Sequence, residues 1–297
     1  MITRLLALLA AVAMIFSAQA WHDHASADIV LTKVEPTGLA GYDPGQWTDT
    51  TFVLVIGSDE RAGLEGQRGD ALHVIGLNAK AGKATILDIP RDTWVDIPGH
   101  GQGRINTAYQ FGGPAFEAEV VTRLTGAPIK YVLSTTFAGF IAMIDALGGV
   151  DVDVPYLMSD PNSGAAFNPG VVHMTGERAL AFSRNRHIPD GDVSRTAHQG
   201  QLIIHGLTDL RAKGTQPTDV LHYLDVLFRN IRTEGISSTD LYRLGTAALK
   251  IEPGQVRNYT IPVFGGMRGS ASVLFVRQPA ATALFVDFAD DAILSAH

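Results

Sequence analysis

The pattern of apolar and polar positions over residues 51–89 predicts three consecutive strands. Residues 51–57 form a nearly continuous apolar run, which is typical of a strand that is covered on both faces. Residues 71–78 and 83–89 also have strand patterns, and the short turn between them, residues 79–82, predicts a hairpin.

The patterns that follow predict alternating helices and strands. Apolar residues recur at helical spacing over residues 114–124, and again over residues 137–147, where a strongly amphipathic stretch ends at Gly148 and Gly149. The remaining patterns predict strands at 131–134, 150–154, 256–263 and 272–276, a loop at 159–170, and helices at 195–210, 220–231, 241–251 and 280–293.

This order of elements indicates an α/β fold around a mixed sheet, because strands alternate with helices and at least one hairpin is present. We expect one domain over residues 51–293, since the chain has no internal repeat and no convincing interdomain linker. Residues 21–50 are rich in turn-forming residues and are expected to be a lead-in linker.

The N-terminus has the features of an export signal. Arg4 is followed by an apolar run over residues 5–16 and then by Ala18-Gln19-Ala20, a small-x-small cleavage pattern before Trp21. Twelve apolar residues are short for a bilayer span, which takes about 20. Residues 1–20 are therefore expected to be a signal peptide or a membrane anchor, and in either case the rest of the chain is exported to the cell envelope.

Composition narrows the classes of function. The chain has 297 residues, of which 46% are hydrophobic, so it can bury a sizeable core. Its net charge of −7 argues against a broad nucleic-acid surface, which needs a basic face. It has no cysteine, which excludes disulfides, thiolate metal sites and cysteine nucleophiles.

Arginine is clustered in one segment. Arg184, Arg186 and Arg195 fall within twelve residues, without a lysine among them, and the first two would point the same way if the segment were extended. The chain has 17 arginines against 6 lysines, which explains the abundance of arginine but not this clustering. A guanidinium grips two phosphate oxygens at once, so the cluster indicates a phosphate-rich ligand.

Arginine and aspartate also meet at the ends of the predicted strands. Asp59 lies just past the first strand, Arg68 and Asp70 lie immediately before the second, and Arg91 and Asp92 follow the third. Each of these residues taken singly is more typical of an ordinary turn or cap. Ligand sites of α/β sheets gather at strand ends, so we expect these groups to converge with the arginine cluster, where a metal ion would also fit.

Several segments in the same order resemble the LytR–CpsA–Psr family of cell-envelope phosphotransferases. They are LVIGSDERAG, RGDALHVIGLNAKAGKATILDIPRDTWVDIPGHGQGRINTAYQFGG, IDALGGVDVDVP, HMTGERALAFSRNRH and GDVSRTAHQGQ, and the resemblance covers roughly residues 51–290. It implies a three-layer α/β/α fold. It also implies an enzyme outside the cytoplasm that moves a glycan phosphate from a polyprenyl-pyrophosphate carrier, at the outer leaflet of the membrane, onto peptidoglycan or a related acceptor.

The resemblance also implies roles for individual residues. Asp59 and Asp70 would hold Mg²⁺, with Mn²⁺ as an alternative, and either carboxylate is a candidate base. The implied pyrophosphate ligands are Arg68, Arg91, Arg184, Arg186 and Arg195, and the implied supporting residues are Asp92, Arg104, Asp192 and Gln199. Catalysis would depend on Asp59, Asp70, Arg91, Arg184 and Arg186. The polyprenyl tail needs an apolar groove, for which the strand faces and residues 137–147 are candidates.

The chain departs from the family pattern at a few positions. Arg104 stands where lysine is frequent, Ser194 occupies a usual glycine, and His198 and Gly200 interrupt a run that normally reads arginine-glutamine-glutamine. Ser194, His198 and Gly200 lie close to Arg195 in the sequence, so they would alter contacts with the acceptor and not the reaction itself. Two alternatives stay open: a hydrolase that uses water as the acceptor, and a non-catalytic protein that binds or regulates lipid-linked glycans.

Overall fold

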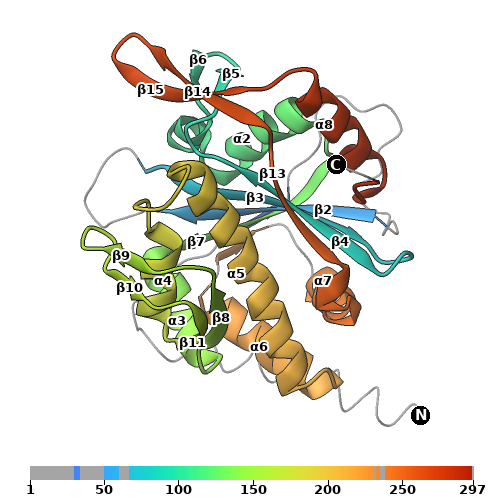
Figure 1. Cartoon of the computed structure of the whole chain (residues 1–297). Coiled ribbons are helices and arrows are strands. Elements are labelled where there is room, and N and C mark those ends of the chain that lie inside the picture. Colours follow the sequence, from blue (N-terminus) through green and yellow to red (C-terminus); the bar gives the residue numbers. More distant parts are fainter. Residues whose placement is uncertain (1–29, 34–49, 60–66, 231, 235–237, 296–297) are drawn as a thin grey trace.

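A seven-stranded mixed sheet forms the centre of the protein. The computed structural model describes residues 30–33, 50–59, 67–230, 232–234 and 238–295, so the predicted export segment lies outside the described residues. The strand order is β12-β1-β7-β2-β3-β4-β13 (Figure 1). These strands are β1 (Val30–Lys33), β2 (Thr50–Ser58), β3 (Gly69–Asn78), β4 (Lys83–Ile89), β7 (Ile129–Thr136), β12 (Arg232–Glu234) and β13 (Val256–Thr260).

The first three long strands run as an antiparallel meander. β2 pairs with β3 and β3 pairs with β4, both antiparallel, which confirms the predicted hairpin at residues 79–82. The chain then crosses through α2 (Ala108–Thr125) and returns as β7, which pairs parallel to β2. β13 adds parallel to β4 at the other side.

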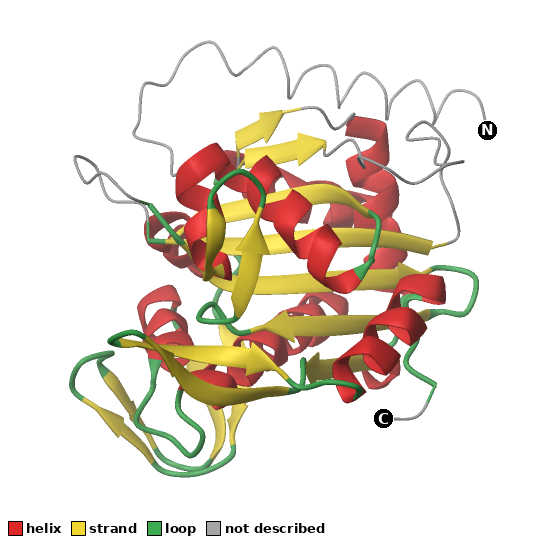
Figure 2. Ribbon diagram, turned by 90° about the horizontal axis from the view of Figure 1, so that it is seen from above, coloured by secondary structure: helices red, strands yellow, loops and turns green. Residues whose placement is uncertain are grey.

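Helices cover both faces of the sheet, as a three-layer α/β/α fold requires. Helices α2 and α8 (Ala280–Asp291) pack on one face, where Leu54, Val121 and Phe288 belong to one buried cluster. The other face is covered by α5 (Asp192–Lys213), α6 (Pro217–Arg229) and α7 (Ser238–Lys250), which appear on the opposite side of the sheet in Figure 1. Figure 2 looks onto the strands from the side of α2 and α8.

A smaller layer at one end of the sheet corrects the predicted loop at 159–170. This stretch contributes to two hairpins: β9 (Met158–Asp160) with β10 (Ala165–Phe167), and β8 (Val150–Val154) with β11 (Gly170–Met174). With α3 (Phe137–Ala146) and α4 (Gly176–Arg184) they surround a third apolar cluster. Three-residue strands are too short to show an alternating pattern, which is why the sequence read as a loop.

Other elements also differ from the prediction. The expected lead-in supplies a strand of the sheet, β1, which pairs with β7 and β12. The expected strand at 256–263 is two strands, because Pro262 has no N–H to continue a ladder, and β14 (Val263–Arg268) forms a hairpin with β15 (Ala271–Val276). β5 (Trp94–Ile97) and β6 (Gly101–Arg104) form a further hairpin that was not predicted.

Helix α2 begins earlier than predicted and is interrupted. It starts at Ala108, but Gly112 and Gly113 have non-helical backbone angles, with φ of +67° at Gly113. The regular part therefore begins near Pro114, where the apolar periodicity placed the helix. None of the helices in the described ranges combines the length and the apolar character needed to cross a membrane.

Candidate functional site

Three strand ends meet at one edge of the sheet and bring the predicted residues together. β2 ends at Ser58 and β7 at Thr136, and the two strands are parallel, so Asp59 and the start of α3 lie at the same edge. The pairing of β2 with β3 shifts register between Gly57 and Ser58, and such bulges are frequent next to active sites. Asp70 was expected before the second strand, but it is the second residue of β3.

The turn after β4 places Arg91 at this edge. The N–H of Thr93 donates to the carbonyl oxygen of Pro90 at 3.0 Å, and the Thr93 hydroxyl donates to the same oxygen at 2.6 Å. The segment is thus the ordinary turn that its proline indicated. The same turn points Arg91 back to β3, where its Nη1 donates to Oδ1 of Asp70 at 2.5 Å.

Asp192 gathers arginines from three segments. Its Oδ1 lies 2.9 Å from Nη2 of Arg195, 3.6 Å from Nε of Arg186 and 3.8 Å from Nε of Arg91. Asp192 is the first residue of α5, where a carboxylate also interacts favourably with the positive end of the helix dipole. One carboxylate therefore orients three guanidinium groups, which confirms that the arginine cluster and the Arg91 turn converge.

The charges of these groups depend on one another because the site is half-buried. Burial by itself would lower the pKa of Arg91, but attraction to Asp70 and Asp192 raises it overall. Burial, together with repulsion from Arg91, lowers the pKa of Arg195, against the attraction of Asp192. The aspartates thus keep positive charge in a place where desolvation opposes it.

A second carboxylate extends this network towards the hairpins. Asp92 lies 3.2 Å from Nε of Arg104, and Arg104 also donates from Nη2 to the carbonyl oxygen of Ser272 at 2.8 Å. Burial and the neighbouring charge of Asp192 raise the pKa of Asp92, while Arg91 opposes this shift. Arg104 therefore ties β15 to the site through Asp92, and neither residue lines the cavity described next.

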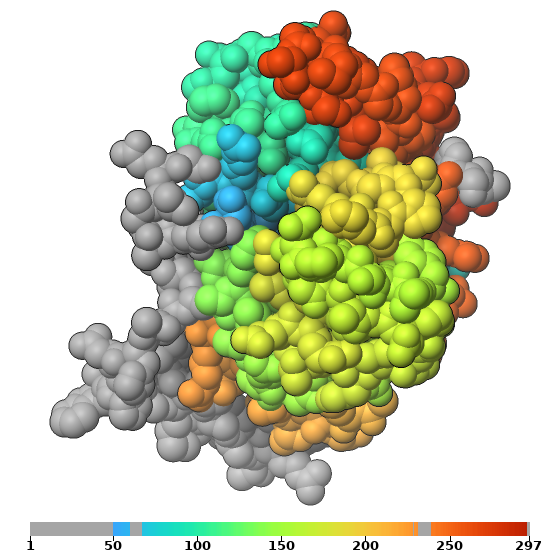
Figure 3. Space-filling model, turned by 60° about the vertical axis from the view of Figure 1, so that its left-hand side comes forward, coloured from blue at the N-terminus to red at the C-terminus, as the bar shows by residue number. Residues whose placement is uncertain are grey.

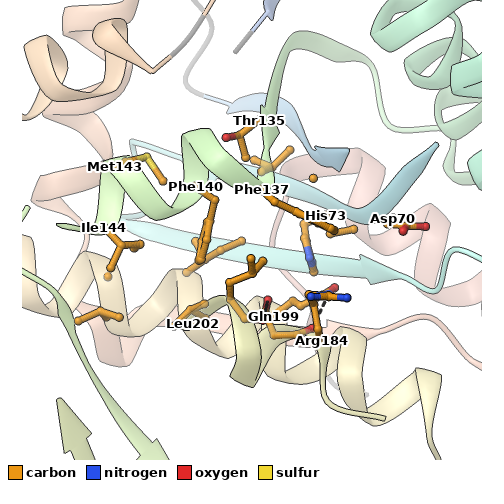
Figure 4. Close-up of a pocket in the computed structure, with 18 of the residues that line it drawn as sticks. Asp70, His73, Thr135, Phe137, Phe140, Met143, Ile144, Arg184, Gln199 and Leu202 are labelled. Atoms are coloured by element: carbon orange, nitrogen blue, oxygen red, sulfur yellow. Dashed lines mark hydrogen bonds between the residues drawn. The ribbon is translucent and has the colours of Figure 1, made fainter. Parts of the chain in front are cut away.

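A cavity of about 680 Å³ opens beside this cluster, between the sheet, α3, α4 and α5. Its polar end is lined by Asp59, Asp70, Arg91, Arg184, Arg186, Arg195 and Gln199. The rest is mainly apolar and is lined by residues such as Val55, Phe137, Phe140, Met143, Ile144, Leu147, Leu202, Ile203, Leu207, Leu210 and Leu227. Figure 4 shows Asp70 at one end and Met143 and Ile144 at the other.

The apolar part of the cavity confirms one prediction and adds one element. The candidate groove at residues 137–147 does line it, through one face of α3. The helix predicted at 195–210 was not a candidate for the groove, yet Leu202, Ile203 and Leu207 of α5 line the cavity. Helical periodicity shows which residues face inward, but not whether they meet another side chain or a space.

Arg184 lines the cavity at its solvent-exposed side, which is called the mouth below. It is the last residue of α4, so it lies on a helix and not on the extended segment that was expected. Its guanidinium lies over the ring of Phe137 at 5.3 Å from the centroid, and the side chain is exposed. Figure 3 shows the yellow-green block that contains α4 on the face next to the start of α5. Gln199, on α5, donates to the carbonyl oxygen of Ser183 at 2.8 Å.

Arg68 is the predicted pyrophosphate ligand that the structure does not bring to the cavity wall. Its side chain is exposed and does not line the cavity. Its backbone N–H donates to Oδ1 of Asp59 at 3.0 Å, and its carbonyl oxygen accepts from the N–H of Asp59 at 3.3 Å. The backbone of Arg68 thus orients Asp59, and a phosphate contact by its side chain stays a prediction.

The two aspartates fit the coordination that Mg²⁺ prefers. Both line the cavity, and their hydrogen bonds within the described residues use Oδ1, which leaves Oδ2 of Asp59 and of Asp70 for a cation. Mg²⁺ is held in many enzymes by one or two carboxylates together with substrate phosphates and water. The described ranges contain no cluster of three or more histidine or carboxylate side chains that would hold a metal without substrate.

A buried pair that sequence reasoning missed also lies in the cavity wall. Nδ1 of His73 and Oδ1 of Asp88 are 2.6 Å apart, and His73 lines the cavity. Both residues occur within predicted strands, and the alternation of β3 places His73 on the same face as Ile75. A polar residue at an inward strand position was the signal in the sequence.

The family of the chain follows from a comparison with known proteins. The family model described as the LytR_cpsA_psr family matches residues 13–287, which is most of the chain. The chain belongs to this family. The predicted resemblance is therefore confirmed.

Named relatives of this family are teichoic acid transferases. A protein of Bacillus mycoides called polyisoprenyl-teichoic acid–peptidoglycan teichoic acid transferase TagU is 37% identical over 191 residues, which is 63% of this chain. The match covers 60% of that protein, and 61% of a similarly named protein of Bacillus cereus that is 37% identical. The chain thus matches about three fifths of the length of these relatives.

Solved structures of the LytR_cpsA_psr family share the fold. The protein YwtF (TagT), solved with bound octaprenyl pyrophosphate lipid, superposes with a TM-score of 0.68 at 20% identity, covering 88% of this chain and 97% of that one. TagV of B. subtilis gives a TM-score of 0.67 at 23% identity, covering 82% and 97%. At these identities the similarity shows the fold, and the α/β/α prediction is confirmed.

The structure explains one of the departures from the family pattern. A side chain at Gly200 would collide with Asn258 of β13 and with Oδ1 of Asp88, so glycine lets α5 approach the sheet closely. His198 packs between Tyr156 and Phe182, with ring centroids 5.8 Å and 5.4 Å away, and burial lowers its pKa. His198 does not line the cavity, so its effect on the site is indirect.

Proposed function

We propose that this protein is a phosphotransferase that moves a glycan phosphate from a polyprenyl-pyrophosphate carrier onto peptidoglycan or a related cell-wall acceptor. The observation that carries this proposal is the composition of a single cavity. Its arginine and aspartate end suits a pyrophosphate, and its apolar remainder suits an isoprenoid tail. The names of the teichoic acid transferases, and the lipid bound to the TagT protein, support the same donor class.

The arginines would bind the donor and stabilise the charge that develops during transfer. Arg91, Arg195 and Arg186 are already oriented by Asp192, so little reorganisation is needed when the pyrophosphate arrives. Arg184, at the mouth, would add a further guanidinium that binds two phosphate oxygens at once. The reaction forms a bond from the acceptor hydroxyl oxygen to the glycan-side phosphorus and breaks the bond from that phosphorus to the bridging oxygen.

Asp59 and Asp70 would hold Mg²⁺, which supplies neutralisation of the pyrophosphate charge when it is bound. One of the same two carboxylates would accept the proton of the acceptor hydroxyl. Asp70 is engaged with Arg91 and Asn106, while Asp59 is held through the backbone of Arg68. Asp59 is the less constrained of the two, although both remain candidates for the base.

The site of action would be the outer side of the cytoplasmic membrane. Residues 1–20 have the pattern of an export signal or an anchor, and a polyprenyl donor is embedded in the bilayer. The net charge of −7 opposes adhesion to anionic lipid headgroups, so contact with the membrane would come from the N-terminal segment or from the bound donor tail.

The test is a reconstituted transfer reaction. Purified protein is incubated with Mg²⁺, a synthetic polyprenyl-pyrophosphoryl sugar and peptidoglycan fragments, and the products are identified by mass spectrometry. We expect a phosphodiester between sugar and peptidoglycan, together with polyprenyl monophosphate. Free sugar phosphate without acceptor product would instead identify a hydrolase, and donor binding without turnover would identify a non-catalytic binding protein.

Substitution of the two aspartates tests the metal assignment. Asp59→Asn and Asp70→Asn should each remove Mg²⁺-dependent turnover and leave the melting temperature near that of the wild type, because both side chains lie at the cavity wall. A variant that keeps full activity shows that its aspartate is not a metal ligand. Arg123→Ala, on the exposed side of α2, is the matched control and should retain activity.

A further inference from the structure

His73 and Asp88 form a buried hydrogen-bonded pair across two central strands. They are register partners on β3 and β4, and Nδ1 of His73 lies 2.6 Å from Oδ1 of Asp88. The side chain of His73 is 3% exposed and that of Asp88 is 0% exposed. Neither residue is one of the ion-pair partners of Asp192, and the proposed transfer uses neither of them.

The contacts of Asp88 hold it in place on the side away from the cavity. Its Oδ2 accepts from the hydroxyl of Thr260 at 3.4 Å, and Gly200 of α5 packs directly against Oδ1. Asp88 therefore fixes the orientation of the imidazole through its contact with Nδ1. The other ring nitrogen, Nε2, has no hydrogen-bond partner within the described residues, although it is buried.

A buried polar atom without a partner in a cavity wall indicates a ligand atom. Leaving such an atom desolvated costs free energy, and most buried polar atoms of native proteins are paired. Gln199 lines the same cavity, and its Oε1 is also buried without a hydrogen-bond partner among the described residues. Nε of Arg91 and Nε of Arg195 are likewise buried without a hydrogen bond, so several polar atoms of this wall are available to one bound molecule.

The position of His73 decides which part of the donor it meets. It lies three residues beyond Asp70 along β3, opposite Val55 of β2, and both His73 and Val55 line the cavity. Figure 4 shows His73 between Asp70 and the apolar side chains of Phe140, Leu202 and Ile144. A donor with its tail in the apolar part would place its lipid-side phosphate nearer to His73 than its glycan-side phosphate.

We propose that His73, held by Asp88, donates a hydrogen bond from Nε2 to the lipid-side phosphate of the donor and so stabilises the departing polyprenyl phosphate. This inference rests on the proposed function, and it assigns a leaving-group contact to a residue outside the arginine cluster. His73 would be a phosphate-binding residue, and Asp88 would be a positioning residue that acts through it.

The contact fits the bond changes of the transfer. When the bond from the glycan-side phosphorus to the bridging oxygen breaks, its electron pair stays on that oxygen, which becomes a terminal oxygen of polyprenyl monophosphate. The hydroxyl proton of the acceptor goes to the carboxylate base, so His73 transfers no proton. Its Nε2–H strengthens its hydrogen bond as negative charge accumulates on the leaving phosphate.

The raised pKa of Asp88 favours a proton on Nε2 of His73, which the proposed hydrogen bond requires. Burial raises the pKa of Asp88 to about 6, although its hydrogen bond to His73 opposes the shift. When Asp88 carries a proton, it donates to Nδ1, and the single N–H of the neutral imidazole then lies on Nε2, where it is available to a ligand. A phosphate anion next to Nε2 favours this state over the one with a bare nitrogen lone pair.

The test compares two probes with the same tail. Octaprenyl monophosphate and octaprenol differ only in the phosphate, and their dissociation constants are measured with the wild type and with His73→Leu, without any turnover. We expect the wild type to prefer the monophosphate, and His73→Leu to reduce this preference by about tenfold or more, as the loss of one charged hydrogen bond implies. Octaprenol binding should change little.

Two further variants keep the test decisive if His73→Leu folds poorly with Asp88 unpaired. Asp88→Leu removes the group that fixes the imidazole through Nδ1, so it should reduce the phosphate preference in the same direction. His73→Gln keeps an N–H donor at similar reach and should retain part of the preference. Ile75→Ala, on the same face of β3 but outside the cavity lining, is the control for lost packing and should keep the wild-type preference.

The outcomes separate this inference from the proposed function. If the wild type prefers the monophosphate and His73→Leu or Asp88→Leu keeps that preference in full, the leaving-group contact is wrong while the donor site stands. If the wild type binds octaprenol and its monophosphate equally, the cavity does not recognise a lipid phosphate, and both proposals fail. In transfer assays, His73→Gln should lose less kcat than His73→Leu at similar KM.

Discussion

The two faces of the central sheet are formed by the same strands, but one is packed against α2 and α8 and the other borders the cavity. Leu54 and Val55 are neighbours on β2 and point to opposite faces. Leu54 is 0% exposed and lies in the closed core beneath α2 and α8, whereas Val55 lines the cavity beneath α3 and α5. One face has been filled by side chains, and the other retains about 680 Å³ of space. The same alternating pattern thus serves both a core and a binding site.

Two glycines show how the faces differ. A Cβ on Gly76 would lie 2.6 Å from Cβ of Ala292 and 2.9 Å from the ring of Phe288, so the closed face has no room for one more carbon. A Cβ on Gly206 of α5, which lines the cavity, would meet nothing within 4 Å. Packing density, and not the polarity of the strands, therefore separates the structural face from the binding face.

The largest effect is expected from a cavity created on the closed face. Leu54→Ala should lower the free energy of unfolding by about 2–5 kcal/mol, because Leu54 lies between Val74 and Val132 of the neighbouring strands. Val55→Ala should cost much less, since its side chain already faces a space. Urea denaturation measures both changes, and equal losses at the two positions would show that the faces are packed alike.

Filling the cavity should remove tail binding without loss of stability. Gly206→Trp would extend an indole into the apolar part and exclude roughly four carbons of an isoprenoid tail, at about 0.8 kcal/mol each, or about 200-fold in affinity. Octaprenol binding measures this effect, and thermal unfolding checks the fold. Unchanged binding would mean that the tail does not lie along α5.

Removing one guanidinium at the mouth should weaken recognition of the phosphates alone. Arg184→Ala should lower the affinity for octaprenyl pyrophosphate by at least about tenfold, since a charged hydrogen bond contributes about 1.5–3 kcal/mol. Octaprenol should bind as before. Arg184→Lys should not restore the affinity, because lysine keeps the charge but loses the fork. Full affinity in either variant would remove Arg184 from the pyrophosphate site.

The smallest effects should come from adding a single methyl group on each face, and they should have opposite signs. Gly206→Ala should stabilise the protein by about 0.5–1 kcal/mol, because alanine favours a helix and the added carbon meets nothing. Gly76→Ala should destabilise it by about 1–3 kcal/mol through overpacking against Phe288 and Ala292. A matching sign in the two unfolding curves would contradict the difference in packing.

Much of the fold was predictable because it depends on local periodicity. The strands β2, β3 and β4 and the helices α3 and α5 to α8 were expected at or near their observed positions. Short hairpins were missed, since three or four residues carry too little pattern, and α4 was missed although it holds Arg184. β1 was not expected because its four residues are too few to show a strand pattern.

The site was partly predictable for a different reason. Arginines and aspartates at strand ends indicated a phosphate site, and most of them do line one cavity. The central position of Asp192 was not readable, because its three arginine partners come from a turn after β4, a loop after α4 and its own helix. His73 and Asp88 were passed over, since a strand pattern does not show that two polar residues 15 positions apart are cross-strand partners.

By itself, the sequence determined the order of strands and helices, the acidic balance and the kinds of side chain available for phosphate and metal, since these depend on residue types and their local spacing. Only the tertiary structure decided which apolar side chains form a closed core and which line a cavity. It also decided which carboxylate orients which arginine. Such pairings arise when distant segments pack together, and the space left between them depends on side-chain volumes summed over several elements.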